Sequence, residues 1–162
     1  MTYGQPATPP PQRVFLVVVD GSPEQRVALR YASLRALHTG GRVALLHVVE
    51  PTDRQHWIAV ESLMRDERRQ EAELLAERYA GEVSAVTGTL PAVHIREGTP
   101  REELLALIED DPTISILVLA AAADSDPGPL VSALATKYLG GLRVPITIVP
   151  GRLSDAEIAA LA

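Results

Sequence analysis

The sequence predicts an α/β protein: one domain with a five-stranded parallel sheet and helices on both faces. Short apolar runs, rich in β-branched residues, alternate along the chain with longer segments of helical periodicity. Most of these runs are apolar throughout, which is typical of strands buried on both faces of a parallel sheet. Such alternation gives β-α-β units with right-handed crossovers. The 162 residues show no internal repeat and fit one domain.

The first apolar run, residues 14–19, organises the chain. It ends in a turn, Asp20-Gly21-Ser22-Pro23. We expect Ser22 to cap the next helix, with Pro23 at its first position and Gln25 where a capping box places Glu or Gln. Ligands of open α/β sheets bind at the carboxyl ends of strands, so a site in this protein would have Asp20 at its floor.

The first half of the chain continues with helix, strand and helix. Residues 24–39 are helical by periodicity and end at Gly40-Gly41, and residues 42–49 form a second buried strand. A long helix is expected over about residues 55–81. The apolar residues at helical spacing in this helix are Trp57, Val60, Met64, Leu75 and Tyr79. Its charged middle contains both signs, which indicates a solvated face.

The second half repeats the alternation. Residues 92–96 alternate in polarity, as an edge strand does, and Thr99-Pro100-Arg101-Glu102 is a helix start. The remaining elements are a helix to about residue 110, a strand over 114–120, a helix over 130–141, a strand over 144–149 and a short helix opened by the capping box Ser154-Asp155-Ala156-Glu157. Residues 1–12 are rich in proline, and we interpret them as an extended, mobile tail. The domain is then residues 13–150, followed by a terminal helix within 151–162.

Composition excludes several classes of function. The net charge of −6 argues against nucleic-acid binding, and the absence of cysteine excludes disulfides and thiolate chemistry. No apolar run is long enough to span a membrane, and no signal-sequence pattern is present, so we expect a cytoplasmic protein without membrane association. The four histidines have no zinc-ligand spacing, and His47 is expected to be packed and hydrogen-bonded. No nucleophile-elbow, Walker or Ser-His-Asp pattern indicates an enzyme.

Several segments in order resemble the universal stress protein family, which has an adenine-nucleotide α-hydrolase-like fold. The segments that carry the resemblance are Val17-Val-Val-Asp20-Gly21-Ser22, Leu46-His47-Val48-Val49, Gly98-Thr-Pro100 and Val144-Pro145-Ile-Thr-Ile-Val149. The resemblance covers roughly residues 13–150. It implies the strand order 3-2-1-4-5 and a homodimer, expected here through the edge strand Val144–Val149. It also places a ligand site between the first and fourth strands, where the order reverses.

The family's ATP-binding members share a glycine pattern after the fourth strand, because glycines let backbone N–H groups approach phosphates. This sequence departs from that pattern. The first glycine position holds Ala121, the second falls near Asp124, and the Gly-Ser pair falls near Ser132-Ala133. Asp124 and Asp126 would also repel a triphosphate. We therefore expect a stress-response or signalling dimer without tight ATP binding and without a resident cofactor.

The alternative is a nucleotide-binding regulator with a variant loop that takes AMP, or ATP with Mg²⁺. The resemblance implies that the Asp20-Gly21-Ser22 turn and Val49 would hold adenosine, while Ala121 and Ser132 would approach the phosphates. Simpler interpretations stand beside these roles, with Asp20 capping the strand-to-helix turn, Ser22 capping the helix and Val49 in apolar packing. Asp20, Asp124 and Asp126 could offer oxygen atoms to Mg²⁺, or could be solvated loop carboxylates.

Overall fold

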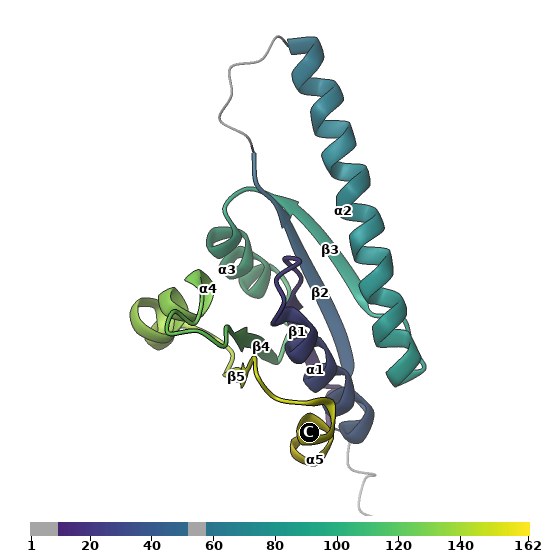
Figure 1. Cartoon of the computed structure of the whole chain (residues 1–162), viewed down its shortest axis with the longest axis vertical. Helices are drawn as coiled ribbons and strands as arrows, with labels where there is room; N and C mark the ends of the chain where they lie inside the picture. The colour runs from purple at the N-terminus through teal and green to yellow at the C-terminus, as the bar shows by residue number, and fades with distance from the viewer. Residues whose placement is uncertain (1–9, 52–57) are drawn as a thin grey trace, which may run out of the picture.

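The computed structural model describes residues 10–51 and 58–162. Most of the expected N-terminal tail and the first turn of the expected long helix, with Trp57, lie outside this range. The five strands form one parallel sheet in the order β3-β2-β1-β4-β5, which confirms the predicted architecture (Figure 1). The strands are β1 Val14–Val18, β2 Arg42–Val49, β3 Ala92–Glu97, β4 Ile116–Ala121 and β5 Ile146–Pro150.

Helices cover both faces of this sheet. They are α1 Gln25–Thr39, α2 Ile58–Thr87, α3 Pro100–Asp110, α4 Pro129–Ala133 and α5 Asp155–Leu161, with a π-helical turn at Leu134–Tyr138 and a 3₁₀ turn at Leu139–Gly141 after α4. Alternate strand residues point to opposite faces. Phe15 and Val17 pack with α1 and α2, whereas Leu16 packs with α3 and the segment that begins at α4.

Several element boundaries differ from the prediction. Helix α2 continues through Gly81 to Thr87, because Ala80 and Val83 are buried on either side of that glycine and offset its low helix propensity. The helix expected over residues 130–141 is α-helical only at its start. In its second part the hydroxyl of Thr136 donates to the carbonyl of Ser132 at 2.7 Å, a local bond of the kind that bends helices.

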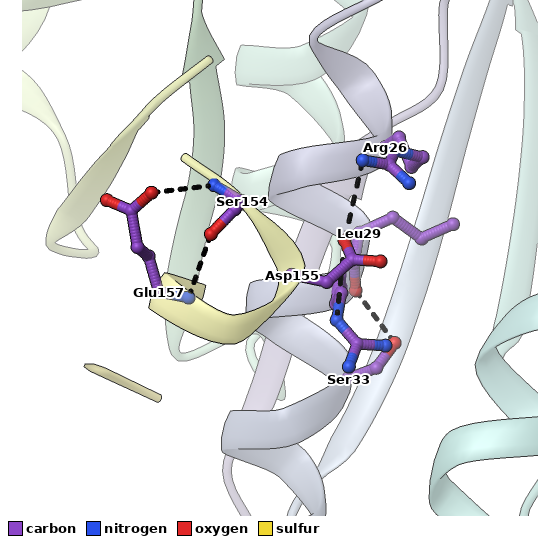
Figure 2. A network of polar contacts seen from close by, with 7 residues as sticks. Arg26, Leu29, Ser33, Ser154, Asp155 and Glu157 are labelled. Carbon is purple, nitrogen blue, oxygen red and sulfur yellow. Dashed lines mark hydrogen bonds and ion pairs between the residues drawn. The ribbon is translucent and has the colours of Figure 1, made fainter. Parts of the chain in front are cut away.

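Two of the three expected N-terminal caps are wrong. Helix α1 begins at Gln25 with no side-chain cap, and the Gln25 side chain bonds elsewhere. Helix α3 has Pro100 at its start as expected, but the Thr99 side chain accepts no capping bond. The capping box of α5 is confirmed: Ser154 Oγ accepts the N–H of Glu157 at 3.2 Å, and Glu157 Oε1 accepts the N–H of Ser154 at 3.3 Å (Figure 2).

The terminal helix α5 packs against α1 (Figure 1). Ile158 is fully buried in the core cluster that includes Ala32 and Ala36 of α1. Asp155 extends toward Arg26 of α1 (Figure 2), at an N–O distance of 3.4 Å. Its Oδ1 also lies 3.7 Å from Nε of Arg30. Within the described ranges, β5 pairs with β4 alone. No helix in that part of the chain is long and apolar enough to cross a membrane.

Candidate functional site

A small cavity lies at the carboxyl ends of β1 and β4, where the strand order reverses. The β1–α1 turn contributes Asp20, Ser22, Glu24 and Gln25, and the β4–α4 loop contributes Pro127, Gly128 and Pro129. Apolar side chains, including Ala28 and Val118, line the rest. The cavity measures about 60 Å³. Pockets that hold drug-sized ligands are roughly 300–1,000 Å³, so this cavity has room for a few water molecules rather than a nucleotide.

The Gln25 side chain organises the β1–α1 turn. Its Oε1 accepts the backbone N–H groups of Asp20 and Gly21, both at 2.6 Å. Gln25 is only 3% exposed, and its Nε2 has no hydrogen-bond partner among the described residues. Because an unpaired buried donor is unfavourable, this Nε2 favours an acceptor in the adjoining cavity, such as a water molecule or a ligand atom.

Several backbone donors of the two loops around the cavity are already bonded to oxygen atoms of the same loops. Asp20 Oδ1 accepts the N–H of Ser22 at 2.9 Å, and Asp126 Oδ1 accepts the N–H of Gly128 at 3.0 Å. The N–H of Ala122 donates to the carbonyl of Pro127 at 3.1 Å. A phosphate in this loop would therefore compete with carboxylate and carbonyl oxygens that already hold these donors.

A close backbone contact fixes the start of the β4–α4 loop. The N–H of Gly151 donates to the carbonyl of Ala121 at 2.8 Å. A Cβ atom on Gly151 would lie 2.4 Å from that oxygen and 3.0 Å from Cβ of Glu24, so a larger residue would force the chain apart. Glycine at this position keeps the end of β5 against both loops of the cavity.

The structure brings only some of the predicted site residues together. Asp20 and Ser22 line the cavity, and Gly21 lies between them in the turn. Val49 instead lines a separate groove of about 210 Å³ between α2 and the ends of β2 and β3. The predicted residues of the β4–α4 segment, Ala121, Asp124, Ser132 and Ala133, do not line the cavity.

Sequence reasoning missed the residues that shape this cavity most. Gln25 was expected to act in a capping box, and its reach back to the two turn N–H groups was not anticipated. Asp126 was expected as a repelling charge but also binds the N–H of Gly128. A glutamine five residues after a strand-end aspartate is the signal that could have indicated the first contact.

Two further expectations concern the packing of His47 and the possibility of a metal site. His47 Nδ1 lies 2.6 Å from the carbonyl oxygen of Val19, which confirms a packed, hydrogen-bonded histidine. Over residues 10–51 and 58–162, no group of three or more His, Asp or Glu side chains is placed to hold a metal ion. Asp20, Asp124 and Asp126 are therefore not gathered into a metal site by the protein alone.

A doubly wound parallel sheet with a cavity at its switch point places the chain in the class of open α/β folds. The universal stress protein family model matches residues 12–150, and the chain belongs to this family. No curated protein matches the chain at a significant level.

Solved structures agree on the fold. The universal stress protein UspA from Lactobacillus plantarum is 19% identical with a TM-score of 0.69, over 86% of this chain and 98% of that one. A universal stress protein in complex with cAMP is 14% identical with a TM-score of 0.62, over 87% and 98% of the two chains. One from Archaeoglobus fulgidus in complex with dAMP is 15% identical with a TM-score of 0.56, over 86% and 97%.

Proposed function

We propose that this chain is a stress-response or signalling protein that acts as a homodimer and does not bind ATP tightly. Family membership supports the broad role. The observation that carries the nucleotide part is the closed β4–α4 loop, where Asp126 holds the N–H of Gly128 beside a cavity of about 60 Å³. A triphosphate bound there would lose the donors that glycines supply in a phosphate loop and would face acidic side chains.

The proposal is tested by releasing bound nucleotide from freshly purified protein. The protein is denatured, and the supernatant is chromatographed against adenine-nucleotide standards. We expect less than one nucleotide per ten chains and no thermal shift with 1 mM MgATP. A ligand at 100 times its Kd stabilises the folded state by roughly 2.7 kcal/mol, so tight binding would be visible in the melting scan. Stoichiometric MgATP binding that is lost in Asp20→Ala would contradict the proposal.

The dimer part rests on the open edge of β5. An unpaired edge strand is a template for association, and pairing with a second copy removes it. Ile148 in the centre of this strand is 40% exposed, although it is a large apolar residue. Helix α5 packs on α1, and β5 pairs with no strand other than β4 among the described residues, which supports association through this edge. Sedimentation at 10 µM protein measures the association directly, and we expect a dimer.

A second candidate function is a regulator that binds an adenine monophosphate. Two observations favour it over ATP binding: the structural neighbours with cAMP and dAMP, and the unpartnered Nε2 of Gln25, which could donate to a ring nitrogen. Binding requires the cavity to widen, and a monophosphate needs fewer loop donors than a triphosphate. A melting scan with AMP, dAMP and cAMP separates the two functions, because the leading proposal expects no shift with any of them.

A further inference from the structure

A second groove lies at the opposite end of the sheet from the cavity. It runs along the amino ends of β1, β2, β4 and β5 and measures about 810 Å³. Its walls are the segment before β1 and the segment before β4, and Arg42 and Arg143 lie at the starts of the β2 and β5 regions. This volume falls in the range of small-molecule sites, whereas the switch-point cavity does not.

The groove is positively charged in an acidic protein. Arg13, Arg42 and Arg143 line it, and no Asp or Glu is among the described residues that line it. The carboxylate of Asp111 lies just outside, bonded to the N–H and hydroxyl of the lining residue Thr113. The whole chain carries a net charge of −6, and residues 1–12 contain no acidic residue that could neutralise the groove. Clefts lined by one sign of charge concentrate counter-ions, so this groove attracts anions.

Two of the three guanidinium groups are available to a ligand. The side chains of Arg13 and Arg42 make no hydrogen bond or ion pair with another residue in the described part of the chain, and both are exposed. Arg143 is different, because its guanidinium donates to the carbonyls of Ile108, Ile114 and Asp111. Arg143 therefore stabilises the end of α3, and its charge acts partly on the neighbouring carboxylate of Asp111, so Arg13 and Arg42 supply the charge that is free for a ligand.

The backbone holds Arg13 and Arg42 side by side, at the starts of the neighbouring strands β1 and β2. The N–H of Arg42 donates to the carbonyl of Arg13 at 2.8 Å. A Cβ atom on Gly41 would lie 2.6 Å from the same carbonyl oxygen, so this close approach depends on glycine. The positions of both Cα atoms are thus set by the sheet, and only side-chain rotamers must be ordered when a ligand binds.

We propose that this groove binds a small phosphate monoester, with the phosphate on Arg13 and Arg42 and an apolar body against the groove wall. Arginine presents a planar fork of donors that matches phosphate oxygens. The apolar surface of the wall is provided mainly by Pro11, Pro112 and the half-buried Val14, while Ile114 and Val144 lie buried beneath it. A ligand that has both a phosphate group and an apolar body should therefore bind more tightly than inorganic phosphate. The site is independent of the proposed function, because it lies at the amino ends of strands whose carboxyl ends form the switch-point cavity.

The test uses phenyl phosphate as the probe. Inorganic phosphate and phenol are the controls, which represent its charged and its apolar part. Backbone amide shifts of the ¹⁵N-labelled full chain are followed by NMR during titration at 50 mM salt. We expect saturable shifts at residues 12–14, 41–43, 113–115 and 142–144, with phenyl phosphate binding at least fivefold more tightly than inorganic phosphate. Shifts confined to the turn at residues 20–25 and the loop at 121–131 would overturn the proposal and point to the switch-point cavity.

Variants assign the effect to the arginines. The double variant Arg13→Gln/Arg42→Gln should weaken phenyl phosphate at least tenfold and leave the melting temperature unchanged, since both side chains are exposed. Arg152→Gln is the matched control, because it removes an exposed arginine beyond β5 at the other end of the sheet. Equal binding by the double variant would overturn the proposal. The proposal would also be overturned if hexaglutamate shifted these amide signals and phenyl phosphate did not, because the groove would then recognise an acidic peptide.

Discussion

The carboxylate of Asp126 accepts the backbone N–H of Gly128 at 3.0 Å, two residues further along the β4–α4 loop. Gly128 has a φ of 104°, a conformation that other residues rarely adopt. A phosphate loop needs a glycine whose N–H is free to bind the phosphate, but here the N–H of Gly128 already has an anionic acceptor. The loop thus retains one element of a phosphate site and supplies its own negative charge to it.

Removing that carboxylate should increase nucleotide affinity. In Asp126→Ala, the N–H of Gly128 is released and one negative charge leaves the loop. Relief of repulsion between two charges about 4 Å apart is worth roughly 1 kcal/mol near water, so under the second candidate function we expect AMP to bind this variant about fivefold more tightly than the wild type, measured by calorimetry. Asp124→Ala removes the same charge from a residue that binds no backbone N–H in the described structure, and it should change affinity less. Equal effects of the two variants would show that charge alone matters.

The fold was predictable because its signals are local. Apolar strands, turn residues and helical periodicity are read from neighbouring residues, and their alternation specifies a parallel sheet. The boundaries that failed depend on tertiary packing. Gly81 looks like a helix end in sequence, yet burial of Ala80 and Val83 carries α2 through it. Propensity is a weak prior that such packing overrides.

The candidate site was less predictable for the same reason. Asp20 could be placed at the end of β1 from the sequence, since a buried strand stops there. Which donors remain free at that point depends on side chains that fold back, and Gln25 and Asp126 both do so. Val49 ends β2 as expected but lines a different groove, which it shares with side chains of α2 and of the end of β3.

Docking of α5 should contribute strongly to stability through one residue. Ile158 is fully buried, and Ile158→Ala should lower the free energy of unfolding by about 2–5 kcal/mol in urea denaturation. Ser154→Ala removes the cap shown in Figure 2 and should cost about 1 kcal/mol. Leu161→Ala is the control, since that side chain is 64% exposed and its loss should change stability by about 0.5 kcal/mol or less. A large effect of Leu161→Ala would indicate that α5 packs elsewhere in solution.

Acid stability should depend on Asp111. The Thr113 hydroxyl and then its N–H hold the pKa of the Asp111 carboxyl below its usual range, partly opposed by burial, with smaller contributions from the charges of His94 and Arg143. Because the folded pKa is lower than the unfolded one, this stabilisation is present above the unfolded value of about 3.9 and is lost as the pH falls through the folded pKa.

Thr113→Val tests this linkage. The variant should raise the pKa of Asp111 in a ¹³C NMR titration and make stability less dependent on pH below about 4. Thr136→Val makes the same change where the hydroxyl bonds a backbone carbonyl, and it should leave the Asp111 titration unchanged. An unaltered Asp111 pKa in Thr113→Val would show that the hydroxyl is not the main cause.

Dimerisation through β5 should be sensitive to charge at Ile148. This residue lies at the centre of Ile146–Pro150, so pairing across a two-fold axis places it near its own copy in the partner. Ile148→Lys would bring two positive charges together on that edge, and charged residues block edge-to-edge pairing. We expect the dimer dissociation constant to rise at least tenfold in sedimentation equilibrium. Leu161→Lys introduces the same charge at a side chain that is also exposed but lies on α5, and it should leave the dimer intact. A wild-type chain that is monomeric at 10 µM, or a dimer that tolerates Ile148→Lys, would place the association elsewhere or exclude it.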